Sequence, residues 1–131
     1  MKQDRILNPE LIRLIAAMGH TQTLVVADAG LPVPKGVPVL DLSLVRGVPS
    51  FLQVLDAVLE ELVVEGCCLA EEMTQFNPEL HSQTCSRMAA MPVDYVTHEA
   101  FKVMTQQAQA VIRTGETSPY ANIILRAGVN F

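Results

Sequence analysis

The stretch TLVVAD, residues 23–28, decides the fold class, because it is a short apolar run with polar residues on both sides. The continuous run from Leu24 to Ala27 is typical of a strand that helices cover on both faces of a sheet. His20 precedes this run and Asp28 follows it directly. The two polar residues are either a cap and a turn residue, or parts of a polar site at the edges of a sheet.

Helical and strand-like segments alternate on both sides of this strand. Asn8 as an N-cap and Gly19 as a terminating residue predict a first helix between them. We expect further strands at 37–44, 63–73, 93–97, 110–116 and 118–131, and helices at 49–62, 77–91 and 98–109. Strands near 24–41 and 110–126 follow one another without a helix. The pattern predicts one α/β domain, residues 1–131, with a mixed, largely parallel sheet flanked by helices.

Two of the predicted helices have apolar residues at helical spacing. In the helix at 49–62 the inward face is formed by Phe51, Leu55, Val58 and Leu62. In the helix at 98–109 we expect Phe101, Met104 and Ala108 to face inward. Apolar residues at this spacing lie along one stripe of a helix, so both helices are predicted to cover the sheet.

Composition excludes several classes of partner. The net charge is −5, and no Lys or Arg occurs between Arg46 and Arg87, which argues against nucleic acid and anionic membranes. Three cysteines without framework spacing suit a reducing compartment, and the adjacent Cys67 and Cys68 lie in an apolar run, as buried inert thiols do. No signal peptide and no apolar run of about 18 residues is evident, so we expect a cytoplasmic protein.

Several polar residues lie where a ligand site can form. Asp28 follows a buried strand, at the end where open α/β sheets bind ligands, but it can equally form an Asx turn. His98 and Lys102 are four residues apart and share a helix face, which is also typical of a solvated helix start. His20 follows a helix C-terminus, where a cap or surface histidine is the simpler interpretation.

Tyr120 and Asn122 complete this set. In a strand, residues two apart point to one side, so the phenol and the amide would lie together, and such groups often hold sugar hydroxyls. The alternative is a loop tyrosine and a turn asparagine after Pro119. His81 is expected to be solvated on a peripheral helix. The chain carries no metal-ligand spacing, phosphate loop or nucleophile elbow, so these residues indicate proton transfer on a hydroxylated small molecule without a metal or covalent step.

Long stretches of the chain resemble one known family. ILNPELIRLIAAMGHTQTLVVADAGLPVP resembles the opening of D-ribose pyranases, and VDYVTHEAFKVMTQQAQAVIRTGETSPYANIILRAGVNF resembles their C-terminal half. The resemblance runs nearly end to end and is weakest across residues 50–92. The DAGLPVP loop and the AGV-x-F ending are similar to the ribose branch rather than to the sister branch, the fucose mutarotases.

The resemblance implies an activity without a cofactor. Members of the family interconvert the pyranose and furanose forms of free ribose, between uptake and phosphorylation. It also implies a ring-shaped homo-oligomer, typically a decamer of two stacked pentamers, with sugar bound between neighbouring subunits. By matching position it implies His20 as the acid/base and the following sugar contacts: Asp28, His98, Tyr120, Asn122 and, on a less specific match, Lys102.

Strand geometry adds an expectation about how the site is assembled. His20 and Asp28 are eight residues apart, roughly 26 Å if fully extended, and a regular strand keeps their side chains separate. A site that contains both residues therefore draws one of them from a neighbouring subunit, or else Asp28 acts indirectly. For Arg113 and Glu116, which match a family motif, we expect a structural ion pair or an interface role.

Three other functions are compatible with these residues. A fucose-type mutarotase would use the same chemistry on another sugar. A non-enzymatic sugar-binding accessory of a transport system would bind ribose without accelerating exchange. A metal-dependent sugar hydrolase or isomerase would use His20, Asp28 and His98 as ligands, although the spacing typical of metal ligands is missing.

Overall fold

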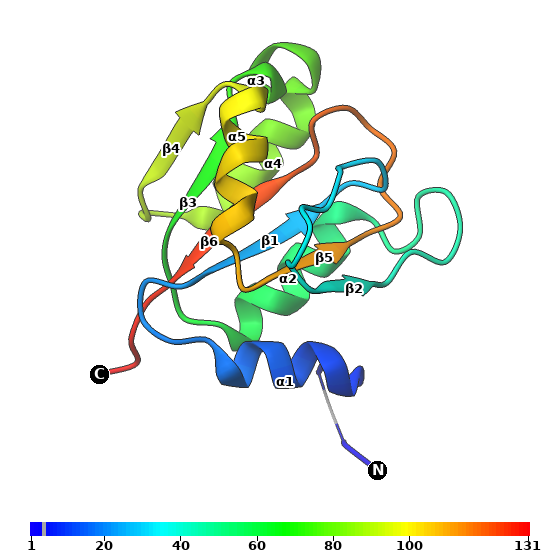
Figure 1. Ribbon diagram of the computed structural model, residues 1–131, viewed down its shortest axis with the longest axis vertical. Helices are drawn as coiled ribbons and strands as arrows, with labels where there is room; N and C mark the ends of the chain where they lie inside the picture. Colours follow the sequence, from blue (N-terminus) through cyan, green and yellow to red (C-terminus); the bar gives the residue numbers. More distant parts are fainter. Residues whose placement is uncertain (4) are drawn as a thin grey trace.

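The fold is a six-stranded sheet between helices, seen in a computed structural model that describes residues 1–3 and 5–131 (Figure 1). Its elements, in chain order, are α1 (Pro9–Ala17), β1 (Thr23–Ala27), β2 (Val39–Asp41), α2 (Phe51–Glu61), β3 (Val64–Ala70), α3 (Glu72–Phe76), α4 (Pro78–Met88), β4 (Val93–Val96), α5 (His98–Met104), the 3-10 turn η1 (Thr105–Gln107), β5 (Ala110–Arg113) and β6 (Ile123–Ala127). None of the helices in this part of the chain is long and apolar enough to cross a membrane.

The strand order is β2-β5-β1-β6-β3-β4, and the sheet is mixed. β2 pairs parallel with β5, β5 with β1, and β3 with β4. β6 runs antiparallel to both of its neighbours, β1 and β3. The mixed, largely parallel α/β sheet predicted from the sequence is therefore confirmed.

β1 is buried on both faces, as its continuous apolar run predicts. Leu24 and Val26 belong to the larger core cluster, which also contains residues of α1, α2 and α4. Val25 and Ala27 point to the opposite face and pack in a smaller cluster with Phe101 of α5. Figure 1 shows α5 on one face of the sheet, with α2 and α4 on the other. Side chains of alternating direction along one strand thus contact two helical layers.

The helix α2 forms the centre of the larger core. Its N-cap, Ser50, accepts from Gln53 N, while the Gln53 side chain accepts from Ser50 N, which makes a capping box. All four residues predicted to face inward are at most 8% exposed: Phe51, Leu55, Val58 and Leu62. This prediction from spacing is confirmed.

The two cysteines in β3 are buried, as expected. Cys67 is 3% exposed and Cys68 is 5% exposed. Burial penalises a thiolate, and it raises the pKa of Cys67 to about 12 and also raises the pKa of Cys68. Both side chains therefore act as small apolar groups of the core.

Several predicted elements are too long: the strands predicted at 37–44 and 110–116, for example, cover only Val39–Asp41 and Ala110–Arg113. Two others end where the chain changes its structure. The strand predicted at 63–73 ends at Ala70, and the short helix α3 follows, because Met73 turns into the core and is fully buried. The helix predicted at 98–109 ends at Met104 and continues only as η1. Met104 is 40% exposed and does not face inward, although Phe101 and Ala108 do.

The last strand begins later than predicted, at Ile123 rather than near 118. Tyr120 has a positive φ of 56°, which is incompatible with a strand, and the N–H of Asn122 donates to the carbonyl of Tyr120. The prediction that these two residues share one side of a strand is therefore wrong. The loop interpretation after Pro119 describes their backbone correctly.

Candidate functional site

Asp28 follows β1 and is held by two donors at the carboxyl end of the strand. Its Oδ1 accepts from Gly30 N at 2.9 Å, which is the Asx turn considered from the sequence. Its Oδ2 accepts from Asn122 Nδ2 at 3.1 Å, while Asp28 N donates to Asn122 Oδ1 at 2.8 Å. Asn122 is 1% exposed. The turn and the polar site are therefore not alternatives, because the same carboxylate belongs to both.

The loop after β5 fixes this end of β1 from the other side. Thr114 donates from both its N and its Oγ1 to the carbonyl of Ala27. Glu116 accepts from Ala29 N through its carbonyl, and its carboxylate accepts from Phe51 N at 3.0 Å and from Ser118 Oγ at 2.8 Å. Glu116 thus holds the start of α2 and the loop together.

His98 is the first residue of α5, so the helix start places its ring beside Tyr120. Its backbone N–H donates to both oxygens of Glu72, at 2.9 Å and 3.0 Å. The ring lies edge-on to Tyr120, with centroids 5.0 Å apart, and stacks on Phe101 at 6.5 Å. Among the described residues, none forms a hydrogen bond with the buried Nδ1 of His98. A buried nitrogen without a partner is unusual in a folded protein, and a bound ligand is one group that can satisfy it.

The backbone of residues 118–120 is anchored by Asn77, the residue before α4. Its Nδ2 donates to Ser118 Oγ at 3.0 Å and to the carbonyl of Pro119 at 2.8 Å. The ring of Phe76 packs against Tyr120, with centroids 5.8 Å apart. These contacts fix a tyrosine that lies in a turn and not in a strand.

Together these elements line an open hollow of about 330 Å³. Its walls are formed by Asp28, Gly30, Leu31, Pro32, His98, Pro119 and Tyr120. A carboxylate, an imidazole and a phenol beside apolar loop residues are groups that hydrogen-bond the hydroxyls of a small molecule.

Lys102 lies one turn after His98 on α5. Its Nζ forms an ion pair with Glu99 Oε1 at 2.8 Å, and Lys102 does not line the hollow. The structure therefore brings together Asp28, His98, Tyr120 and Asn122, and leaves Lys102 at the side.

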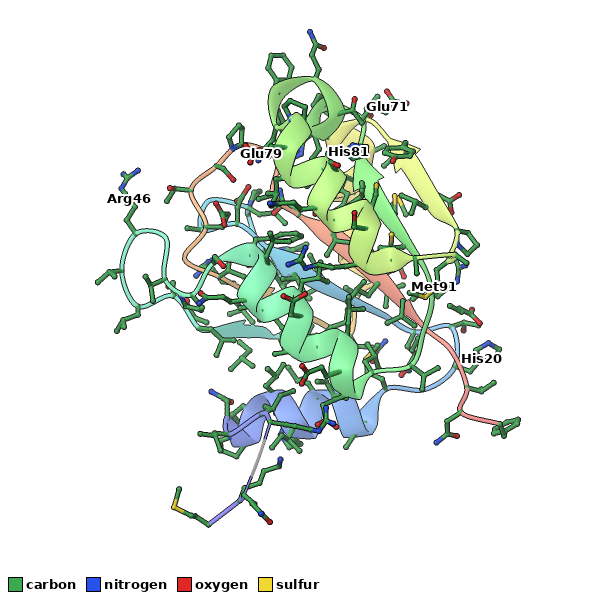
Figure 2. All side chains as sticks on the ribbon, turned by 180° about the vertical axis from the view of Figure 1, so that it is seen from behind. His20, Arg46, Glu71, Glu79, His81 and Met91 are labelled. Carbon is green, nitrogen blue, oxygen red and sulfur yellow. The ribbon has the colours of Figure 1, made fainter. Side chains whose placement is uncertain are left out.

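His20 lies at the opposite end of β1. Figure 2 shows its side chain beside the C-terminal segment, across the molecule from the loop that carries Arg46. It lines a separate hollow of about 310 Å³ with Glu61 and the segment 127–131. Arg46, by contrast, lines a third hollow that includes Asp28. The regular strand predicted between His20 and Asp28 does separate them within one chain.

His20 has a carboxylate partner that was not identified from the sequence. Its Nε2 lies 2.9 Å from Oε2 of Glu65, the second residue of β3, and Oε1 of Glu65 accepts from Arg126 Nε at 3.0 Å. The His20 bond is the largest of the causes that lower the pKa of Glu65. Glu65, Glu72 and Glu116 are widely spaced acids in the sequence, and only the fold gives them partners.

Two other predictions concern residues outside the hollows. Arg113 forms an ion pair with Asp41 at 3.0 Å, as expected for a structural role. Asp41 also accepts from Ser43, and this hydrogen bond is the largest cause that lowers the pKa of Asp41. His81 is not simply solvated, because its Nε2 lies 2.6 Å from the hydroxyl of Tyr95.

Known proteins share this fold and sequence. The chain matches the RbsD / FucU transport protein family over residues 1–130. It is 57% identical to the D-ribose pyranase of Geobacillus kaustophilus (strain HTA426), over all of this chain and 96% of that protein.

Solved structures are similar as well. Bacillus subtilis RbsD, solved complexed with D-ribose, has a TM-score of 0.97 and 46% identity, over the whole of both chains. The fucose mutarotase of Streptococcus pneumoniae, solved with L-fucose, has a TM-score of 0.78 and 25% identity over 95% of each chain. The chain belongs to the RbsD / FucU transport protein family.

Proposed function

We propose that the chain is a D-ribose pyranase, an isomerase that interconverts the β-pyranose and β-furanose forms of free D-ribose. The observation that carries this proposal is the polar hollow at the carboxyl end of β1, in a fold that is similar to ribose-bound RbsD at a TM-score of 0.97. Full-length relatives named D-ribose pyranase support it.

The reaction requires proton transfer and nothing else. The anomeric hydroxyl of the ring form loses a proton while the ring oxygen gains one, which opens the sugar to the aldehyde. The aldehyde then rotates and closes through a different hydroxyl. No oxidation state changes, so an imidazole that gives and takes one proton near neutral pH suffices.

We assign the acid/base role to His20 and the sugar contacts to the other end of β1. Asp28 is a charged acceptor for sugar hydroxyls, and Asn122 fixes it through two hydrogen bonds. His98, whose Nδ1 has no hydrogen-bond partner among the described residues, and Tyr120 line the same hollow. Lys102 is proposed as a further contact, which requires its ammonium to leave Glu99.

Because His20 and Asp28 line different hollows of one chain, we propose that a complete site forms between two copies. His20 of one subunit would face the Asp28 end of its neighbour in a ring-shaped homo-oligomer, which we propose to be a decamer of two pentamers. Exposed apolar side chains support such contacts: Leu44 is 76% exposed and Val45 is 60% exposed. Free cysteines support a cytoplasmic location.

Magnetisation-transfer NMR on equilibrated D-ribose tests the proposed activity. We expect the protein to accelerate pyranose–furanose exchange on ribose more than anomer exchange on L-fucose. Faster exchange on L-fucose alone would favour a fucose-type mutarotase. Ribose binding without accelerated exchange of either sugar would favour a sugar-binding accessory of transport.

A further inference from the structure

We infer that Glu65 is the positioning residue for His20, that Arg126 fixes Glu65 in turn, and that Nδ1 is the ring nitrogen that meets the sugar. This inference rests on the proposed role of His20 and assigns the atoms on which that role depends.

A register shift between β3 and β6 places the side chain of Glu65 beside His20. Val64 pairs with Ala127 and Gly66 pairs with Arg126, so Glu65 is an extra residue in a β-bulge between β3 and β6. A bulge redirects a side chain that a regular ladder would point elsewhere. On the other side, Thr21 N donates to the carbonyl of Ala127, which ties the turn after α1 to the end of β6. These contacts bring His20 and Glu65 together from residues that are far apart in the sequence.

The hydrogen bond between them determines where the neutral ring holds its proton. An ionised carboxylate only accepts, so the 2.9 Å contact between Nε2 and Oε2 requires hydrogen on Nε2. The neutral imidazole then carries its lone pair on Nδ1. No hydrogen bond from a described residue reaches that nitrogen. Nδ1 can therefore take the proton of the anomeric hydroxyl and return one to the ring oxygen.

Arg126 occupies the second oxygen of Glu65. Its Nε donates to Oε1 at 3.0 Å, so each carboxylate oxygen has its own donor. A Cβ on Gly66 would lie only 2.6 Å from Arg126 Nη2, so the glycine leaves space for this guanidinium. With both oxygens engaged, the carboxylate cannot rotate freely away from His20. Among the described residues, Glu61 at the end of α2 is the acidic side chain that lines the His20 hollow, whereas Glu65 contacts His20 from outside that lining.

The pair has little reason to exist for stability alone. The side chains of His20 and Glu65 are 50% and 35% exposed, and ion pairs at such exposure contribute little to folding. A variant of Glu65 should therefore fold normally. A change in its activity would report on His20 and not on the stability of the fold.

The test compares Glu65→Ala and Glu65→Gln with Glu10→Gln, which removes an exposed carboxylate paired with Arg13 on α1. We expect Glu65→Ala to lower kcat for ribose exchange about 10–100-fold, a part of what acid–base catalysis supplies, with KM little changed. Glu65→Gln should lower kcat less than Glu65→Ala does, because the amide oxygen of glutamine can still accept a hydrogen bond from His20 Nε2. Glu10→Gln should match the wild type.

¹⁵N NMR of labelled protein shows which nitrogen of the His20 ring carries the proton. The spectrum is recorded at a pH where the ring is neutral. We expect the proton on Nε2 in the wild type and a mixture of tautomers in Glu65→Ala. A wild-type ring with its proton on Nδ1, or wild-type kcat in Glu65→Ala, would overturn the inference. If the wild type does not accelerate exchange, the proposed function fails, while the tautomer measurement still decides how Glu65 holds His20.

Discussion

The two ends of β1 are built differently. At the carboxyl end, Asp28 is held by Asn122 and Gly30, and the surrounding loops are tied by Thr114 and Glu116. At the amino end, His20 projects from a turn and is 50% exposed, with one carboxylate beside it. In the proposed assignment, the first end is a preorganised binding surface, and the second carries the proton-transferring group at the molecular boundary. The proposed function therefore places binding and chemistry in separate parts of one chain, which would meet when two copies associate.

The largest effect should come from removing the imidazole. His20→Ala should lower ribose exchange about 10²–10⁴-fold, since it removes the proposed acid/base, while ribose affinity stays close to the wild-type value. Magnetisation-transfer NMR measures the rate, and calorimetric titration of ribose measures the affinity. The matched control is His81→Ala, which removes a histidine bound to Tyr95 and should keep full activity. Equal losses of exchange rate in His20→Ala and His81→Ala would contradict the separate role of His20.

Removing the carboxylate at the other end should affect binding first. Asp28→Ala leaves Gly30 N and Asn122 Nδ2 without their acceptor and deprives the sugar of a charged acceptor. Hydrogen bonds to charged groups contribute about 1.5–3 kcal/mol, so ribose affinity should fall roughly 10–100-fold.

The control for this variant is Asp56→Ala, which removes a carboxylate paired with Arg87 on the surface. It should leave ribose titration unchanged. An unaltered affinity in Asp28→Ala, with the fold intact by circular dichroism, would remove Asp28 from the site.

Substitution of two glycines, Gly115 and Gly19, tests how rigid the two ends of β1 are. A Cβ on Gly115 would overlap the backbone carbonyls of Val45 and Val48, which cannot move cheaply. A Cβ on Gly19 would meet only the side-chain end of Gln22, at 3.3 Å. We expect Gly115→Ala to lower the free energy of unfolding by about 1–3 kcal/mol in urea titrations. Gly19→Ala should change it by less than about 0.5 kcal/mol. Similar losses would mean that the ends are equally rigid.

The smallest effect concerns acid stability at the His20 end. Hydrogen bonds from His20 and Arg126 lower the pKa of Glu65 from its ordinary 4.5. The unfolded chain then binds more protons at this carboxyl than the folded chain does, so stability rises with pH through that range. The contribution is present above pH 4.5 and is lost as pH falls through the lowered value. We therefore measure the thermal unfolding temperature from pH 6 down to pH 3. It should fall less in Glu65→Gln than in the wild type.

The sequence predicts those features of the two ends of β1, and of the helices around it, that depend on the local pattern of apolar and polar residues. An unbroken apolar run predicts a strand buried on both faces, and β1 is one. Apolar spacing predicts the inward face of α2. Residue type and position also identify both Asp28 and His20 as polar groups at the strand ends, because such groups interrupt the pattern that a core requires.

The remainder depends on contacts between distant segments. Tyr120 lies in a turn with positive φ, because Asn77 and Phe76 hold the loop before β6, and strand alternation cannot reveal such anchors. Glu65 contacts His20 across 45 positions through a bulge, and a bulge has no clear local signature. Long-range partners of this kind become visible only when the sheet order is known.

The composite site between copies can be tested most directly by complementation. His20→Ala subunits lack the proposed acid/base, and Asp28→Ala subunits should bind ribose too weakly to show much exchange at ribose concentrations near the wild-type dissociation constant. The two variants would be co-expressed with different tags and purified as mixed oligomers. If each site takes His20 from one subunit and Asp28 from its neighbour, random mixing restores about a quarter of the sites. Magnetisation-transfer NMR on D-ribose should then show roughly that share of wild-type exchange. Mixed oligomers as inactive as either parent would mean that His20 and Asp28 of one chain serve the same site, which would contradict the proposed assembly.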